Sequence, residues 1–280
     1  MITHDGLDTL LHALDALDLP GGTWVATDAD GTLWAADVAD AAWHRLLGAR
    51  GVRAPGASLL ARLVADAAGL APTGDPHADA AALYDAYGRG VVDDWVMLEA
   101  MTGCYAGWTP GELRAFGEAV GREVAARAYE TTRPLLDALA ARGLRVAVVS
   151  GSPHLLVEES VRALGLPTPP LVVGVGLEAE GPDAAADGAL SPRLARPIPW
   201  EAGKVDALRA RGVEHQVALG DTLGDLALLE AAPALRVLVH PRPGLRARAQ
   251  GQAGPWHVLA PARTISGEPV RPRDVDRAIA

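Results

Sequence analysis

Residues 23–34 read Thr-Trp-Val-Ala-Thr-Asp-Ala-Asp-Gly-Thr-Leu-Trp, and this stretch decides the fold class. Its apolar beginning predicts a short buried strand that ends at Asp28, Asp30 and turn residues. Open α/β sheets bind their ligands at such strand tips. Two carboxylates two residues apart on an extended segment share one side of the chain and repel each other when both are ionised. We therefore expect a divalent cation, a shared proton or both. The alternative is a turn in which the aspartates only cap backbone groups.

The composition is that of an acidic globular protein. The chain has 280 residues, of which 49% are hydrophobic and 21% charged, and its formal net charge is −10. This length allows one large domain, or a core plus an insertion. The negative charge argues against nucleic acid or an anionic membrane as a partner. No apolar stretch approaches the ~20 residues that span a bilayer and no signal peptide is visible, so we expect a cytoplasmic protein.

The single lysine and the single cysteine are informative because each occurs only once. Lys204 is the only lysine, and every other cationic side chain is an arginine. A single retained lysine indicates a position that needs a compact ammonium, with chance survival as the alternative. Cys104 is the only cysteine, which excludes a disulfide framework and predicts a reducing compartment. We expect its side chain to serve as a small buried hydrophobe.

The segment after the first strand predicts helices rather than strands. Over residues 35–127 the pattern is helical, with breaks at 51–56, 71–76 and 107–110 and no β-branched alternation. Residues 109–112, Thr-Pro-Gly-Glu, predict a helix start with a hydroxyl N-cap, a proline at the first position and a carboxylate at the third. We therefore expect a helical insertion that takes no part in a sheet.

Elsewhere helical and strand patterns alternate, which predicts a parallel sheet with helices on both faces. The expected helices cover residues 7–18, 131–142, 153–164, 201–211 and 223–231. Besides the strand that leads into Asp28 and Asp30, the expected strands cover residues 144–150, 171–175, 216–221, 236–240 and 256–259, with a short hairpin near 186–190.

Three further element ends carry polar residues. Residues 149–153, Val-Ser-Gly-Ser-Pro, end a strand and predict a helix with Ser152 as N-cap, whose N–H groups would form an anion cradle with the preceding hydroxyl. Lys204 follows a glycine at a predicted helix start and would point its ammonium at the same edge. Asp221 ends a strand, and Asp225, four residues on, stacks on the same helical face.

In chain order these segments resemble the four motifs of the haloacid dehalogenase (HAD) superfamily of aspartate-nucleophile phosphohydrolases. The matching residues are Asp28-Ala29-Asp30-Gly31-Thr32, Ser150-Gly151, Lys204 and Gly220-Asp221-Thr222-Leu223-Gly224-Asp225. The helical insertion resembles the cap of the phosphoserine-phosphatase-like branch. The resemblance implies an α/β fold: a Rossmann-like parallel sheet core with helices on both faces, plus an all-helical cap inserted after the first strand. It divides the chain into a catalytic core, residues 1–33 and 129–280, and a cap, residues 34–128.

The resemblance also implies a metal and a reaction. Mg²⁺ would be held by the Asp28 carboxylate, the backbone carbonyl of Asp30, Asp221 and waters. Asp28 would attack phosphorus and form an aspartyl-phosphate. Asp30 would protonate the leaving group and then take a proton from the hydrolytic water. The implied activity is that of a Mg²⁺-dependent phosphomonoester phosphatase.

Further residues receive supporting roles from the same resemblance. Thr32, Ser150, Gly151 and Lys204 would bind the substrate phosphate, where charge is spread in the transition state. Asp225 would orient a metal-bound water or Lys204 from the second coordination shell.

The partner implied is a small phosphorylated metabolite, such as phosphoserine or an amino-alcohol phosphate. Asp37 stands where phosphoserine phosphatases carry an acidic residue that contacts the substrate amine. The insertion also holds seven tryptophans and tyrosines together with Asp93 and Asp94. Rings beside carboxylates favour a cationic leaving group. The alternative is that the rings fill the core of a helical bundle.

Two other functional classes use similar residues. A phosphosugar mutase would carry the same four motifs and differ only in its cap. A receiver-like phosphoacceptor module, which is not an enzyme, also combines aspartates, a hydroxyl and a lysine at strand ends. It would be near half this length and would need no helical insertion.

Overall fold

A computed structural model describes residues 2–179, 188–250, 252, 254 and 256–270. Seven strands form one sheet in the order β1-β9-β8-β7-β2-β3-β4, and all neighbouring pairs are parallel. The strands are β1 (Ile2–Asp5), β2 (Trp24–Thr27), β3 (Arg145–Pro153), β4 (Leu171–Val175), β7 (His215–Gly220), β8 (Leu235–Val239) and β9 (Trp256–Leu259). The predicted α/β class with a Rossmann-like parallel sheet is confirmed.

Helices cover both faces of the sheet because its strands are apolar on both sides. Val25 and Val148 pack into a core cluster with residues of α1 (Leu7–Ala16), α7 (Thr132–Ala141) and α8 (His154–Ala163). Their neighbours Ala26 and Val149 pack into a second cluster on the opposite face. The helices of that face are α9 (Gly203–Arg209), α10 (Leu226–Glu230) and α11 (Pro243–Gln250). This alternation with a period of two is what a strand buried on both faces requires.

Five helices lie between β2 and α7, as the helical pattern predicted. They are α2 (Val38–Gly48), α3 (Ala54–Asp66), α4 (Pro76–Gly88), α5 (Asp94–Gly103) and α6 (Pro110–Ala126). The structure adds one break that the pattern did not reveal, between α4 and α5, where Gly90 has a φ of +71° and Asp93 caps α5. The predicted helix start at Thr109 is confirmed as a capping box with Glu112.

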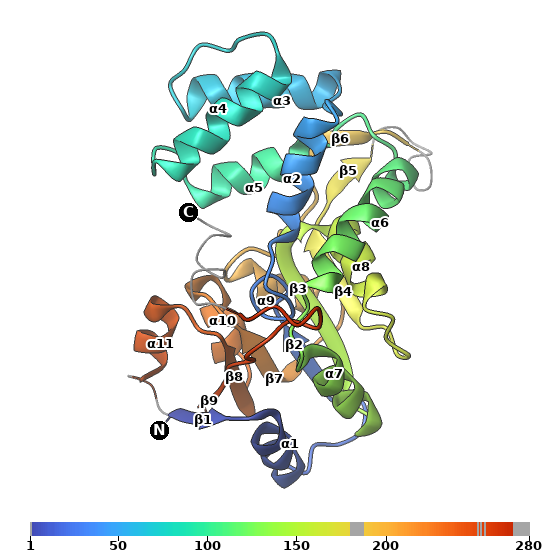
Figure 1. Ribbon diagram of the computed structural model, residues 1–280, viewed down its shortest axis with the longest axis vertical. Coiled ribbons are helices and arrows are strands. Elements are labelled where there is room, and N and C mark those ends of the chain that lie inside the picture. Colours follow the sequence, from blue (N-terminus) through green and yellow to red (C-terminus); the bar gives the residue numbers. More distant parts are fainter. Residues whose placement is uncertain (1, 180–187, 251, 253, 255, 271–280) are drawn as a thin grey trace.

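The helices α2 to α5 and the helix α6 lie in different places. In Figure 1, α2 to α5 stand together beyond one end of the sheet, whereas α6 runs alongside α8. The α6–α8 contact is close because α6 presents Gly117 and Gly121 to the backbone and side chain of Glu159. The division into a core and a cap at residues 34–128 stays a prediction, and α6 is the part of that segment that packs most extensively on a helix of the sheet.

Three expectations about the elements need correction. β1 precedes the strand that we expected to be the first, so the helical insertion follows the second strand of the chain. The pattern also missed α11. Ser152 is not the N-cap of α8, because β3 continues to Pro153 and that proline occupies the N-cap position. The Ser152 hydroxyl instead donates to Asp30.

Two smaller expectations concern a hairpin and the cysteine. The antiparallel pair β5 (Leu177–Ala179) and β6 (Leu190–Leu194) forms the predicted hairpin, although residues 186 and 187 of its expected turn lie outside the described residues. Cys104 is fully buried, as expected of a small hydrophobe.

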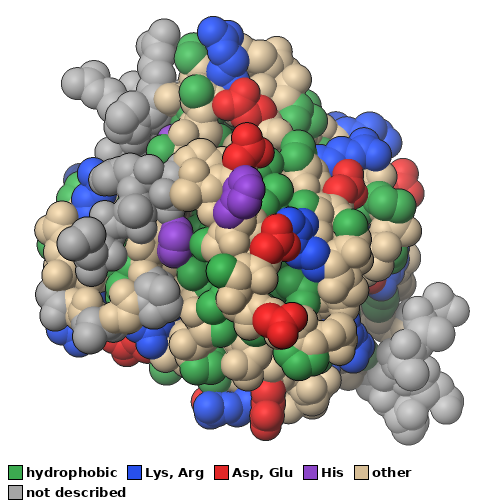
Figure 2. Space-filling view, turned by 90° about the horizontal axis from the view of Figure 1, so that it is seen from below, with side chains coloured by type: hydrophobic (Ala, Val, Ile, Leu, Met, Phe, Trp, Pro, Cys, Tyr) green, Lys and Arg blue, Asp and Glu red, His purple; other side chains and the backbone are tan. Residues whose placement is uncertain are grey.

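The surface agrees with the acidic composition. On the face shown in Figure 2, the described acidic and basic side chains are interspersed and form no continuous basic patch. Among the described residues, no helix is both long and apolar enough to cross a membrane.

The α6–α8 contact generates a stability prediction for Gly121→Ala. A Cβ at this position would lie 2.7 Å from the carbonyl oxygen of Glu159. Because backbone atoms of a packed helix cannot move aside cheaply, we expect the free energy of unfolding to fall by about 1–3 kcal/mol in urea titrations. The control is Gly48→Ala at the exposed end of α2, where a Cβ meets nothing within 4 Å. That change should be neutral or stabilising by up to about 1 kcal/mol. Equal effects of the two changes would contradict the close contact.

Candidate active site

The predicted polar strand ends meet at one edge of the sheet. β2 lies between β3 and β7, so the segments that follow these three strands are neighbours, and the Asp28 N–H donates to the Leu219 carbonyl at 3.0 Å. Together with the start of α9 they line one cavity of about 470 Å³. Seven of the nine predicted site residues line it: Asp28, Asp30, Asp37, Ser150, Gly151, Lys204 and Asp221.

Lys204 is buried between two carboxylates. Its Nζ lies 2.6 Å from Asp28 Oδ1 and 2.6 Å from Asp225 Oδ1, and only 6% of the residue is exposed. Burial alone would lower the pKa of the ammonium, but the charges of Asp225 and Asp28 outweigh it and raise the pKa. Burial alone would likewise raise the pKa of Asp225, and Lys204 outweighs it and lowers that pKa. Lys204 and Asp225 are therefore an ionised pair.

Asp28 and Asp221 are less well compensated. Burial, and then the charge of Asp225, raise the pKa of Asp28 to about 7 despite the opposing charge of Lys204. Burial and the charges of Asp225 and Asp28 raise the pKa of Asp221 well above its usual range, although Arg242 and Lys204 oppose the shift. The negative charges around Asp28 and Asp221 are therefore not fully offset by Lys204 and Arg242.

A close backbone approach sets the position of Asp221. Gly31 has a φ of +77°, and a Cβ there would lie 2.2 Å from Asp221 Oδ2, so only glycine fits. Thr32 is buried, does not line the cavity, and donates its hydroxyl to Asp221 Oδ1 at 3.3 Å. Asp221 Oδ2 is buried and has no hydrogen-bond partner among the described residues. Oxygens of Asp28, Asp221 and Asp225 lie within 4.8 Å of one another, as a metal site requires.

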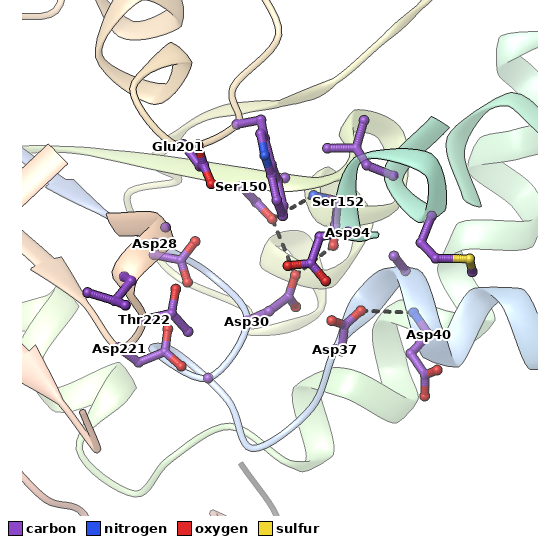
Figure 3. A pocket seen from close by; sticks show the side chains of 18 of the residues that line it. Asp28, Asp30, Asp37, Asp40, Asp94, Ser150, Ser152, Glu201, Asp221 and Thr222 are labelled. Atoms are coloured by element: carbon purple, nitrogen blue, oxygen red, sulfur yellow. Dashed lines mark hydrogen bonds between the residues drawn. The ribbon is translucent and has the colours of Figure 1, made fainter. Parts of the chain in front are cut away.

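Asp30 has a different environment from Asp28, although only one residue separates them. Its Oδ1 accepts the Trp34 Nε1–H at 2.8 Å and the Val38 N–H at 2.9 Å. Its Oδ2 accepts the hydroxyls of Ser152 at 2.7 Å and Ser150 at 3.3 Å. Burial nevertheless raises the pKa of this carboxyl against these hydrogen bonds. Figure 3 shows Asp30 beside the two serines, apart from Asp28 and Asp221.

Asp37 lies on the side of the cavity away from Asp28 (Figure 3). It is the N-cap of α2 and accepts the Asp40 N–H through Oδ1 at 2.8 Å. Burial, and then the charge of Asp30, raise the pKa of Asp37 well above its usual range. Asp37 is therefore close enough to Asp30 for the two carboxyls to interact.

The structure also brings in residues that the sequence analysis did not assign to the site. Ser152 holds Asp30, and its position two residues after Ser150 on β3 was the available signal, since alternate residues share a side. Trp200, Glu201, Asp40 and Arg242 line the cavity as well. Of the seven tryptophans and tyrosines of the insertion, Tyr84 and Tyr87 line the cavity. Trp34, Trp43, Trp95, Tyr105 and Trp108 do not.

Comparisons with known proteins identify a matching family. The model of the haloacid dehalogenase-like hydrolase family matches residues 25–230, well over half of the chain. A search of curated proteins gives no match.

Three solved structures illustrate the likeness of fold. A protein of unknown function from Bordetella pertussis Tohama I has 24% identity and a TM-score of 0.60, over 86% of this chain and 99% of that one. A functionally unknown protein from Anaerococcus prevotii has 12% identity and a TM-score of 0.63, over 91% and 92%. A phospho-aspartyl intermediate analogue of phosphoserine phosphatase has 17% identity and a TM-score of 0.52, over 93% and 100%.

The buried ammonium generates a prediction for Lys204→Met. Removing it leaves the carboxylates of Asp28 and Asp225 buried without their cation, which should lower the free energy of unfolding by about 3–5 kcal/mol in metal-free urea titrations. The double variant Lys204→Met/Asp225→Asn should recover part of this loss, because it removes one of the two uncompensated charges. A single-variant cost below about 1 kcal/mol would contradict the ion pair's structural role.

Proposed function

The chain belongs to the haloacid dehalogenase-like hydrolase family, and we propose that it is a Mg²⁺-dependent phosphatase of small phosphomonoesters. The observation that supports this best is the shared cavity, in which Asp28, Asp30, Asp221 and Lys204 meet at the ends of adjacent strands. The Asp28 carboxylate lies beside the buried Lys204 ammonium, and the Asp30 carboxyl is held apart from it. Asp221 adds a buried oxygen without a hydrogen-bond partner among the described residues. This set of groups is suited to phosphoryl transfer.

The donor set suits Mg²⁺. Carboxylate oxygens are the ligands this ion prefers, and Asp221 Oδ2 is a buried oxygen without a partner among the described residues. Both oxygens of Asp225 already accept hydrogen bonds, one from Lys204 and one from backbone N–H groups. We therefore assign Asp28 and Asp221 as ligands, and the resemblance to the family adds the backbone carbonyl of Asp30. The bound ion would offset the repulsion between Asp28 and an anionic phosphoryl group.

Asp28 is the nucleophile in this proposal. Its carboxylate attacks phosphorus, the bond from phosphorus to the ester oxygen breaks, and the phosphoryl group is transferred to Asp28. Asp30 gives its proton to the departing oxygen. A water then attacks the phosphorus and loses a proton to Asp30, which frees Asp28 and releases phosphate. The raised pKa of Asp30 supports this role, because a carboxyl must be protonated at the first step to serve as an acid.

The remaining residues bind and orient. Ser150, the Gly151 N–H and Lys204 line the cavity where the phosphoryl oxygens would lie, and their donors would stabilise the charge that spreads there. Asp225 holds Lys204, and Thr32 holds Asp221, so both act through another residue. Thr32 is therefore assigned to the support of a ligand, in place of the direct phosphate contact that the resemblance implied.

The helical segment over residues 34–128 is proposed as the cap that selects the leaving group, with residues 1–33 and 129–280 as the catalytic core. Support comes from α2, α4 and α5, whose residues line the part of the cavity beyond Asp30. Likeness of fold to a phosphoserine phosphatase makes phosphoserine one candidate substrate, and an amino-alcohol phosphate is the other.

We predict that Asp28→Asn reduces kcat by at least about 10³-fold, since the amide loses both the nucleophile and a metal ligand. Phosphate release from para-nitrophenyl phosphate would be measured with Mg²⁺, after removal of metal by EDTA, and after Mg²⁺ is restored. The control is Asp206→Asn, an exposed carboxylate on α9, which should leave the rate unchanged. Near-wild-type turnover by a deamidation-free Asp28→Asn sample would refute the covalent mechanism. With a sugar phosphate as the substrate, transfer of the phosphoryl group to another hydroxyl of the sugar instead of to water would indicate a mutase.

For Lys204→Arg we predict a loss of kcat of about 100-fold, equivalent to ~2.7 kcal/mol of barrier. The charge is kept, but a forked guanidinium cannot take the ammonium's place between Asp28 and Asp225. A urea titration alongside the kinetics separates loss of activity from loss of folded protein. A variant that is folded and keeps more than about a third of the wild-type activity, a difference of ~0.6 kcal/mol, would show that charge alone suffices.

A further inference from the structure

We propose that the leaving group of the substrate carries a positively charged nitrogen and no carboxylate, and that Asp37, Asp40 and Asp94 bind this cation. The inference rests on the proposed phosphatase function and deepens it. It separates the two candidate substrates, because phosphoserine carries a carboxylate and an amino-alcohol phosphate does not.

The cavity has two ends of different composition. At one end lie Asp28, Asp221 and Lys204, where the phosphoryl group would bind. The other end is formed by the start of α2 and by α4 and α5. Figure 3 shows Asp37 and Asp40 on that second side, across Asp30 from Asp28 and Asp221. A leaving group attached to a phosphate at the first end would therefore extend towards the second.

The second end is acidic and, among the described residues, lacks cationic side chains. Asp37, Asp40 and Asp94 line it, and no lysine, arginine or histidine of residues 34–128, all of which the structure describes, lines the cavity. The two cationic residues that line the rest of the cavity in the described part of the chain lie at the phosphoryl end: Lys204 contacts Asp28 and Asp225, and the charge of Arg242 acts on Asp221. A substrate carboxylate at the second end would meet like charges only, whereas an ammonium would meet opposite ones.

The partners of these carboxylates differ from those of other acids in the same helices. Tyr84 donates its hydroxyl to Asp40 Oδ1 at 2.5 Å, and Tyr87 donates its hydroxyl to Asp94 Oδ1 at 2.7 Å. Away from the cavity, acids of this segment pair with arginine, as in Arg50–Asp75, Arg53–Glu112 and Arg62–Glu99. A phenol orients a carboxylate without cancelling its charge, so the charge stays available to a ligand. His44, whose ring is mostly exposed, lies 3.4 Å from Asp40 but does not line the cavity.

The tyrosine rings add a second attraction for a cation. Tyr84 and Tyr87 are one helical turn apart on α4, and their ring centroids are 6.4 Å apart. The indole of Trp200 lines the cavity too, and it lies against Gly151. Aromatic faces beside carboxylates are the combination that binds primary and quaternary ammonium groups. Asp37 completes the set, because it lines the same cavity close enough to Asp30 for the two carboxyls to interact.

The test compares phosphate esters that differ in charge and not in shape. Phosphoethanolamine would be measured against propyl phosphate, and phosphocholine against 3,3-dimethylbutyl phosphate, in which carbon replaces the nitrogen. Phosphoserine tests the effect of an added carboxylate, and para-nitrophenyl phosphate reports whether the phosphatase chemistry operates at all. We expect kcat/KM for at least one cationic ester to exceed that of its neutral analogue, and that of phosphoserine, by at least about tenfold.

Variants then assign this preference to residues. Asp37→Asn and Asp94→Asn should each lower the ratio of cationic to neutral kcat/KM by at least about fivefold, since an amide keeps the shape and removes the charge. Asp93→Asn is the matched control: it neighbours Asp94 but caps α5 outside the cavity, and asparagine caps equally well, so the ratio should stay at the wild-type value.

The outcomes separate the two proposals. Equal kcat/KM for cationic and neutral analogues, or a preference for phosphoserine, would overturn the inference and leave the phosphatase intact. No hydrolysis of any ester, including the aryl phosphate, would overturn the proposed function and the inference with it. The comparison of isosteric esters on the wild-type protein decides the matter even if a variant does not fold.

Discussion

The interaction on which the rest of the site depends is the contact of one buried ammonium with two carboxylates. Lys204 begins α9, Asp28 follows β2, and Asp225 belongs to the 3₁₀ turn Leu223–Asp225 after β7. Burying these charges is favourable only while they lie within hydrogen-bond distance of one another. The contact among Lys204, Asp28 and Asp225 therefore fixes three separate segments. It also explains why a chain that otherwise uses arginine keeps a lysine here. A guanidinium has neither the size nor the donor directions for a point between two carboxylate oxygens 2.6 Å away on either side.

Asp28 and Asp30 show how one turn gives two neighbouring carboxyls different chemistry. Asp28 faces Lys204, whereas Asp30 is held by four donors that include the first N–H of α2 and the indole of Trp34. Gly31, with its positive φ, lets the chain turn directly after Asp30 and lets Asp221 approach the backbone. The same turn joins the acid to the insertion, because Val38 and Asp37 lie at the start of α2. The start of α2 therefore fixes both the position of Asp30 and that of the second end of the cavity.

The insertion shows a corresponding division between its surface and its inner side. Several outer carboxylates pair with arginines, whereas Asp40 and Asp94, which line the cavity, accept hydrogen bonds from tyrosines. In a chain of net charge −10 this division concentrates uncompensated negative charge in one concave place. The acidic composition argues against nucleic acid or an anionic membrane as a partner. It is consistent with a substrate whose phosphate binds to the core and whose other end is positively charged.

The sequence by itself determined the local features: the parallel α/β class, the ends of β2 and β7, the capping box at Thr109 and the place of Lys204 at the same edge of the sheet. These follow from periodicity, turn chemistry and rarity, which act over a few residues. It missed β1 at the sheet edge, placed Ser152 at a helix cap, and could not tell Tyr84 and Tyr87 from the buried rings of Trp43 and Tyr105. Those outcomes were decided by tertiary structure alone. Strand order, the partner of a hydroxyl and the side to which a ring points depend on contacts between segments far apart in the chain, and spacing along the chain carries no record of such contacts.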